Sequence, residues 1–334
     1  MVKNMLQKLL NKEHLNARDI EVFVNGIVNN QITDSQIGAF ILGLTLKGAE
    51  LDELKFLVDS IREKSDFLHF NQAVLGCTGT GADFQETFNI STASSIVAAA
   101  AGAKVVKKVM PAVIERTGNL EFLKALGVRA CITEQEAQKQ FSDAGICFVS
   151  AQHFNPVENK LFEIRKELAQ QSVFNVSDAL INYGVSDYQL VGTAILEIAE
   201  NMAEVLKYLN VKHAMVVNAQ NPLLDEISIC SETTVFELKD GEIEKYEITP
   251  DKFGIKRAEI LSLRGATAEY NANLVIDIFS GNIKDSKLDI VAMNAGAMLY
   301  LCGEARNHLE GIMKAYTTIS NGLALQKVMN LRKI

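Results

Sequence analysis

Glycine, hydroxyl and amide residues between positions 79 and 92 form a pattern that suits phosphate binding. They follow an apolar run, 73–76, that predicts a buried strand, and precede 93–101, which predicts a packed helix. A strand, a glycine loop and a helix start aim backbone N–H groups and a positive helix end at one point. Glycines let the backbone approach the anion, hydroxyls add donors, and an aspartate would face a metal ion brought by the phosphates. The candidate residues are Gly79, Gly81, Asp83, Thr87, Asn89, Ser91 and Thr92. A Gly-x-Gly element alone is weak evidence, but with the following Asn-Ile-Ser-Thr it favours phosphate.

A lysine cluster, Lys104, Lys107 and Lys108, lies on the next expected strand, 104–107. Ligands gather at the carboxyl ends of parallel strands, so Lys107 is predicted to lie near the same anion. A solvated surface cluster is an equally good explanation of the lysines by themselves.

Two further groups have both a functional and a structural interpretation. Asp225 and Glu226 follow the expected strand 214–217, where adjacent carboxylates would hold Mg²⁺. A turn or helix cap is the better explanation for an isolated acidic pair. Arg165 would bind a carboxylate in bidentate fashion if it faced a pocket, whereas a surface ion pair with a glutamate neighbour is the alternative. Cys77 is expected to be a small buried residue rather than a nucleophile.

The order of elements predicts an α/β fold with two parts. Residues 1–65 are expected to form four short helices, and strands and helices alternate from residue 73 onward. We expect a small N-terminal all-helical domain, 1–68, joined by helices from a helical insertion at about 158–208. The remainder, 70–157 and 209–334, is expected to form a large α/β domain whose mostly parallel central sheet is covered by helices. Asp240-Gly241 predicts a hairpin, and long helical patterns close the chain.

Composition narrows the function class. The 334 residues carry a formal net charge of −8, which gives no global basic field for nucleic acid. No apolar run reaches the roughly 18 to 20 residues of a membrane helix, and no signal peptide is apparent. Five cysteines without metal-ligand spacing indicate reduced thiols and a cytoplasmic protein.

Taken together, these residues resemble the anthranilate phosphoribosyltransferase family, which shares its fold with pyrimidine nucleoside phosphorylases. The likeness runs nearly end to end and is carried by the stretch from Thr87 to Lys107, by 125–128, 173–175 and 189–192, and by 225–228. The family joins anthranilate to phosphoribosyl pyrophosphate (PRPP) in tryptophan synthesis and releases pyrophosphate.

The resemblance implies roles for the candidate residues. Those of the glycine loop and helix start, with Lys107, would hold the pyrophosphate and its Mg²⁺. Metal would be held by Ser91, Asp225 and Glu226, and Arg165 would face the acceptor's carboxylate. No residue would act as a covalent catalyst, because Mg²⁺ and backbone donors stabilise the leaving group. A homodimer through the N-terminal helices is also implied.

The sequence departs from the family in its glycine loop and in the segments on the acceptor side. The glycine loop, usually Gly-Thr-Gly-Gly-Asp-Gly, has Ala82 and Phe84 at its fourth and sixth positions. Residues 108–112 read Lys-Val-Met-Pro-Ala in place of His-Gly-Asn-Arg-Ser, and 178–180 read Asp-Ala-Leu in place of Gly-Pro-Leu. The phosphate and metal residues are retained, whereas the acceptor-side residues are mostly changed.

Three hypotheses follow. The first is a Mg²⁺-dependent phosphoribosyltransferase acting on anthranilate or a related aromatic acceptor. The second is transfer to a different acceptor in a specialised pathway. The third is a non-catalytic binding or regulatory homologue, for which the net charge argues against a nucleic-acid partner.

Overall fold

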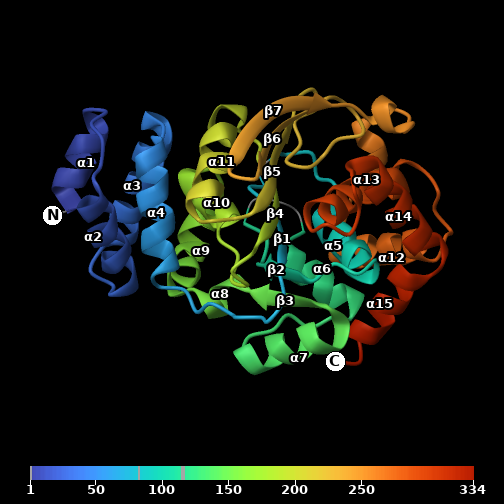
Figure 1. Cartoon of the computed structure of the whole chain (residues 1–334). Helices are drawn as coiled ribbons and strands as arrows, with labels where there is room; N and C mark the ends of the chain where they lie inside the picture. Colours follow the sequence, from blue (N-terminus) through green and yellow to red (C-terminus); the bar gives the residue numbers. More distant parts are fainter. Residues whose placement is uncertain (1, 82, 114–116) are drawn as a thin grey trace.

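The computed structural model describes residues 2–81, 83–113 and 117–334, so Ala82 lies outside the described residues. The expected N-terminal helices are present as α1 (Val2–Leu10), α2 (Ala17–Val28), α3 (Asp34–Lys47) and α4 (Leu51–Arg62). A capping box begins α3, since Thr33 and Gln36 each accept a hydrogen bond from the other's backbone N–H. Figure 1 shows these helices as a layer at one end of the molecule.

A mostly parallel sheet forms the centre of the molecule, which confirms the predicted fold class. Its strands are β1 (Leu75–Gly79), β2 (Val105–Val109), β3 (Ile146–Ser150), β4 (Tyr188–Gly192), β5 (His213–Ala219), β6 (Thr233–Lys239) and β7 (Glu242–Ile248). Within the described residues the strand order is β3-β2-β1-β4-β5-β6-β7, parallel from β3 to β5 and antiparallel beyond. Asp240 and Gly241, both with positive φ, form the predicted hairpin turn.

Helices cover both faces of the sheet (Figure 1). One face carries α5 (Ile90–Ala100), α6 (Asn119–Leu126), α12 (Ala268–Phe279), α13 (Ser286–Leu301), α14 (His308–Ser320) and α15 (Leu323–Leu331). The other carries α8 (Ala151–Phe154), α9 (Pro156–Leu168), α10 (Val173–Leu180) and α11 (Ala199–Tyr208). Helix α7 (Glu134–Ala144) packs beside β3, and short 3₁₀ helices span Leu196–Ile198, Pro250–Phe253 and Ile260–Leu263.

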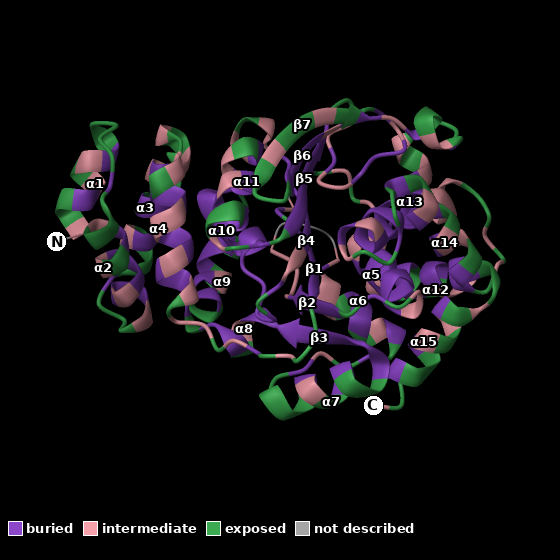
Figure 2. Cartoon of the chain, viewed as in Figure 1, coloured by how far each residue is buried: buried purple, intermediate pink, exposed green. Residues whose placement is uncertain are grey.

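The sheet separates two hydrophobic cores. Successive strand residues point to opposite faces, so Val105 and Leu190 belong to the core with α5 and α13, whereas Val106 and Val191 belong to the other. That second core also contains the apolar faces of α1 to α4, and α9, α10 and α11 contact them directly. Figure 2 shows the strands from β1 to β6 largely buried, the edge strand β7 largely exposed or intermediate, and exposed residues on the outer faces of the helices.

One expectation about this region is wrong. The segment 158–208 is not helical throughout, because β4 lies within it and pairs with β1 on one side and β5 on the other. The strand begins with Tyr188 and Gln189 and ends in Gly192, so it has no continuous apolar run to mark it. Among the helices of the described residues, none has the length and hydropathy that a membrane-spanning segment requires.

Candidate active site

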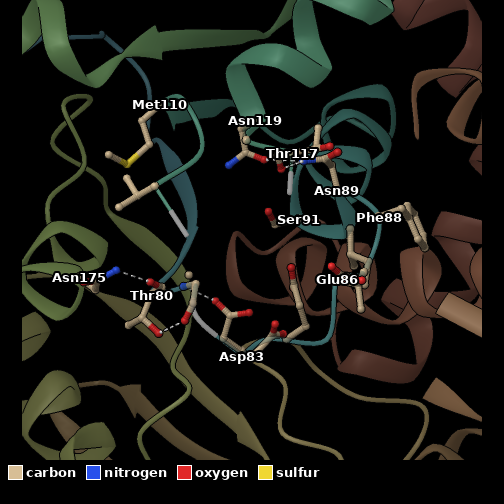
Figure 3. Close-up of a pocket in the computed structure, with 18 of the residues that line it drawn as sticks. Thr80, Asp83, Glu86, Phe88, Asn89, Ser91, Met110, Thr117, Asn119 and Asn175 are labelled. Carbon is tan, nitrogen blue, oxygen red and sulfur yellow. Dashed lines mark hydrogen bonds between the residues drawn. The ribbon is translucent and has the colours of Figure 1, made fainter. Parts of the chain in front are cut away.

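A pocket lies at the carboxyl ends of β1 and β2, between α5 on one face of the sheet and α9 with α10 on the other. Figure 3 shows Thr117, Asn119 and Asn89 on one side of it, Thr80 and Asn175 on the opposite side, and Ser91 between them. Most of the candidate residues line this pocket: Gly79, Gly81, Asp83, Thr87, Asn89, Ser91, Arg165, Asp225 and Glu226. Residues widely separated in sequence therefore meet at one place.

The start of α5 provides the anion-binding geometry. Its first residues, Ile90 and Ser91, line the pocket, so the positive end of an eleven-residue helix faces the cavity. Asn89 precedes the helix and is held in place by other amides, because Asn271 Nδ2 donates to Asn89 Oδ1 over 3.1 Å. Thr92 is not on the wall: it is fully buried and donates to Asn119 Oδ1 over 2.7 Å, and Asn119 lines the pocket.

Lys107 lies behind the wall rather than on it. Its ammonium donates to the carbonyl oxygen of Cys77 over 2.9 Å and to Ser91 Oγ over 3.2 Å, and the residue is 1% exposed. The positive charge is close enough to favour the ionised form of Glu226. The structure thus places Lys107 beside the helix start, as the sequence predicted, but as a buried counter-charge. Burial raises the pKa of the Cys77 thiol to about 12, which does not suit a nucleophile.

The acidic pair is held against the end of β1. The N–H of Gly81 donates to Asp225 Oδ2 over 2.8 Å. A Cβ on Gly79 would lie 2.3 Å from that oxygen, and a Cβ on Gly192 would lie 1.5 Å from the Asp225 carbonyl oxygen, so both glycines permit this approach. Burial, reinforced by the charges of Asp225 and Asp83, raises the pKa of Glu226 well above its usual range.

The donor set around the acidic pair consists of oxygen atoms. Ser91 lies next to it, because its backbone N–H bonds the Glu226 carboxylate. Within residues 2–81, 83–113 and 117–334, no group of three or more His, Cys, Asp or Glu side chains forms a ready-made metal cage. Two carboxylates and a hydroxyl suit a hard cation that takes its remaining ligands from phosphate and water, which is how Mg²⁺ is commonly bound.

Arg165 lines the pocket but has a partner within the chain. Its Nη1 donates to Glu158 Oε2 over 2.9 Å, and both residues are at most 3% exposed. Beside this pair, Lys108 donates to the carboxylate of Asp178, which also lines the pocket. The alternative interpretation, that Arg165 forms an ion pair with a glutamate, therefore holds. The pair is buried, however, and does not lie on the surface.

Phe84 stands at a glycine position of the family's loop, yet its bulk does not enter the pocket. The residue has a φ of 59°, so the loop does require a left-handed conformation there. Its side chain is directed outward, however, since the residue is 65% exposed and is not part of the pocket wall. The substitution therefore strains the backbone without filling the pocket.

Several wall residues escaped prediction from the sequence. Asn175 Nδ2 donates to the carbonyl oxygen of Thr80 over 3.1 Å and so supports the glycine loop from α10. Asn119 and Asn271 fix the position of Asn89. A single asparagine forms no recognisable motif in a sequence. The one signal for Asn119 was its position directly after Gly118, at the start of α6.

Comparison with known proteins agrees with this geometry. Residues 71–325 match the family described as "Glycosyl transferase family, a/b domain", and residues 3–65 match "Glycosyl transferase family, helical bundle domain". The chain is 35% identical to an anthranilate phosphoribosyltransferase of Brevibacillus brevis, over 100% of this chain and 98% of that protein. The chain belongs to the anthranilate phosphoribosyltransferase family. It is a glycosyltransferase of the phosphoribosyltransferase class.

Solved structures of this family superpose over nearly the whole chain. The anthranilate phosphoribosyltransferase of Thermus thermophilus is 27% identical, with a TM-score of 0.89 and coverage of 98% of each chain. A Saccharomyces cerevisiae enzyme in complex with PRPP and Mg shares the fold at 22% identity, with a TM-score of 0.89 over 99% of this chain and 97% of that one. The curated Methanocorpusculum labreanum relative is 34% identical over 99% of this chain and 97% of that protein.

Proposed function

We propose that the chain transfers the phosphoribosyl group of PRPP to anthranilate or a related aromatic acceptor, and releases pyrophosphate. The observation that carries this proposal is the meeting of the α5 N-terminus, the Gly79–Gly81 loop and the Asp225–Glu226 pair around one pocket. The names of the family members support the donor and the acceptor class. The yeast relative with PRPP and Mg bound supports the same donor and metal.

The oxygen donors of the site fit Mg²⁺, so we include it in the proposal. Asp225, Glu226 and the Ser91 hydroxyl would hold the metal, with Asp83 nearby. Bound Mg²⁺ would neutralise charge that develops on the pyrophosphate oxygens as they leave. The crowding of the Asp225, Glu226 and Asp83 carboxyl groups, which raises the pKa of Glu226, supports this assignment, because a divalent cation would relieve the repulsion between their ionised forms.

In the proposed reaction the acceptor nitrogen forms a bond to the anomeric carbon of the ribose while the bond from that carbon to the pyrophosphate oxygen breaks. The pyrophosphate would leave with the electron pair of the broken bond, and the nitrogen would then lose a proton to water. The positive end of α5 would stabilise the leaving pyrophosphate, with Lys107 adding positive charge from behind Ser91. Walls on both faces of the sheet would orient the two substrates, which converts a bimolecular step into one within a bound complex.

The test has two readouts. Calorimetry with PRPP and Mg²⁺ measures donor binding alone, and a pyrophosphate-release assay with a set of aromatic acceptors measures transfer. We expect Mg²⁺-dependent PRPP binding and acceptor-dependent pyrophosphate release. Absence of PRPP binding would contradict the proposal and favour a non-catalytic role for the scaffold.

We further propose a homodimer through the N-terminal helices. A mostly apolar groove on α1 and α3 is lined by Leu6, Leu9, Leu10, Ala39, Gly43 and Leu46, together with Lys12 and Lys47. Leu10 and Leu46 are 77% and 85% exposed, which is unfavourable unless a partner covers them. A second copy of the chain is the occupant that the family resemblance implies.

The domain boundaries and the location stay proposals as well. We assign 1–68 to the helical domain, with helices from 158–208, and the remainder to the α/β domain. All five cysteines lie in the described part of the chain and are free thiols, which supports a reducing, cytoplasmic environment.

A further inference from the structure

Four buried charged side chains lie together on the α9 and α10 side of the pocket. Arg165 and Glu158 form one ion pair, and Lys108 and Asp178 form another. Each of the four residues is less than one-tenth exposed. The set holds two positive and two negative charges, so its net charge is zero when all four groups are ionised.

The pairs are arranged in two layers. Arg165 and Asp178 line the pocket, whereas Glu158 and Lys108 are not part of the wall and neutralise them from behind. The guanidinium is the group of this set that would attract an anionic ligand, and Glu158 already occupies one of its N–H groups. A ligand that reaches these four residues therefore meets the Arg165 guanidinium, whose positive charge is already paired with Glu158 in the described part of the chain.

Two buried atoms show that the arrangement leaves hydrogen bonding incomplete. Glu158 Oε1 and Arg165 Nε have no hydrogen-bond partner in the described part of the chain. Glu158 is faced by the carboxylate of Asp178 from α10, by Lys108 from β2, by the Tyr183 hydroxyl and by Arg165 of its own helix. Burial and the Asp178 charge raise the pKa of Glu158 to about 7. Near neutral pH this carboxylate therefore gains a proton readily, and its protonation frees the charge of Arg165.

The remainder of this part of the pocket wall combines the uncharged amide of Asn175 with apolar side chains. Met110, Pro111 and Val113 follow β2 and line the same cavity. The α5 side is taken by the phosphate and metal groups, so the acceptor of the proposed reaction must bind against these residues and the neutralised Arg165. Apolar side chains and an uncharged polar wall suit a flat ring with an uncharged hydrogen-bonding substituent.

We propose that Glu158 acts as an internal substitute for an acceptor carboxylate, so that the site selects an uncharged aromatic amine over an anionic one. This inference rests on the proposed phosphoribosyl transfer and defines the acceptor class for it. Glu158 is a specificity-determining residue that acts through Arg165.

The experiment compares two acceptors that differ in charge but hardly in shape: anthranilate, an anion, and its uncharged amide, 2-aminobenzamide. Binding of each to the full-length protein loaded with PRPP and Mg²⁺ is measured by calorimetry from pH 6 to pH 8, alongside pyrophosphate release. The variants are E158Q, whose amide can accept from Arg165 and donate to Asp178, and E163Q, an exposed control on the same helix.

We expect the unaltered protein to favour 2-aminobenzamide at pH 8. In E158Q, anthranilate binding should strengthen roughly 10- to 100-fold, the usual effect of a freed charge-assisted hydrogen bond, while 2-aminobenzamide changes little. In the unaltered protein, anthranilate binding should also strengthen as the pH falls through about 7, because Glu158 is then neutral. E158Q should lose that pH dependence, and E163Q should keep it.

Equal or better binding of anthranilate by the unaltered protein at pH 8 would overturn the inference, as would binding of neither acceptor. An unchanged pH profile in E158Q would overturn the role of Glu158. These outcomes are separate from failure of the proposed function, which is absence of PRPP binding before any acceptor is added. The two-acceptor comparison in the unaltered protein decides the inference even if E158Q folds poorly.

Discussion

The backbone N–H of Gly81 donates a hydrogen bond of 2.8 Å to Oδ2 of Asp225, which is 144 residues further along the chain. This bond joins the loop after β1 to the acidic segment after β5. It means that the proposed phosphate and metal groups are positioned by one another. A change in either segment should therefore disturb both ligands.

Asp225→Asn tests the metal assignment. The amide oxygen can still accept from Gly81, but the charge is lost and the repulsion with Glu226 is removed. We expect Mg²⁺-dependent PRPP affinity to fall by about 100-fold, the upper end of the range for disturbed metal sites. Thermal stability should be unchanged or higher, because one partly buried charge fewer has to be desolvated. Titration calorimetry with PRPP, with and without Mg²⁺, together with a melting curve, checks both parts.

If the variant bound PRPP and Mg²⁺ as tightly as the parent protein, Asp225 would not be a metal ligand. A lower melting temperature with normal binding would give this residue a structural role instead.

Gly192→Ala tests the close approach of the two segments. The new Cβ would lie 1.5 Å from the Asp225 carbonyl oxygen, so the backbone of one segment must move. We expect a loss of unfolding free energy of about 3 kcal/mol and weakened PRPP binding. The matched control is Gly38→Ala in α3, where the nearest atom would lie 3.8 Å from the Cβ. The control should gain up to about 1 kcal/mol from helix propensity. Denaturant unfolding compares the two, and equal stabilities would refute the close contact.

The sequence predicted the fold more completely than the site. The expected strands 73–76, 104–107 and 214–217 overlap β1, β2 and β5, because short apolar runs identify buried strands. Strand β4 was not predictable, because Tyr188, Gln189 and Gly192 interrupt its apolar character and its pairing with β1 and β5 is a tertiary property.

The pocket likewise contains residues that a local sequence pattern identifies and residues that only the tertiary structure brings together. Residues of the glycine loop and helix start are contiguous, so their type and spacing indicate phosphate binding without a structure. Asn119, Asn271 and Glu158 are isolated polar residues on helices, and such residues are usually solvated. Their contribution arises because separate helices bring them together. The effect of Phe84 also needed the structure, which directs the ring outward.

Phe84→Gly tests the strain in the glycine loop. A bulky residue at a φ of 59° costs about 1 to 2 kcal/mol, and glycine removes this while adding about 0.5 to 1 kcal/mol of backbone entropy in the unfolded state. We expect a net gain of roughly 0.5 to 1 kcal/mol in unfolding free energy. Phe84→Ala, which removes the ring but keeps a Cβ, should give no such gain. PRPP affinity should stay within about twofold of the parent in both variants, because the ring is not part of the pocket wall. Greater stability in the alanine variant than in the glycine variant would exclude strain as the cause.

The apolar groove on α1 and α3 predicts the oligomeric state. We expect the unaltered chain to sediment as a dimer and the double variant L10E/L46E to sediment as a monomer, because two exposed leucines would become charges at the interface. Leu261→Glu is the control, since Leu261 is also 74% exposed but lies outside the groove. Sedimentation velocity at micromolar concentration separates the two species. A monomeric parent protein, or a dimeric double variant, would contradict the proposed interface.

His308 predicts how stability depends on pH. Burial lowers its pKa to about 4, and its Nε2 bonds the carbonyl oxygen of Met293 over 2.9 Å at the start of α14. Between about pH 6.5 and pH 4 the unfolded chain binds a proton at this histidine and the folded chain does not. The contribution of His308 to unfolding free energy therefore falls as the pH falls through this window, by about 3 kcal/mol in all.

His308→Gln removes the titration but keeps an N–H donor for Met293, so the acid-induced loss of stability should shrink by about that amount. His69→Gln, at an exposed position, is the control and should leave the pH profile unchanged. Urea unfolding at half-unit steps from pH 4 to pH 7 gives the three profiles. Parallel profiles for the parent and His308→Gln would mean that this histidine becomes charged in the folded protein, and that burial against α13 does not exclude its proton.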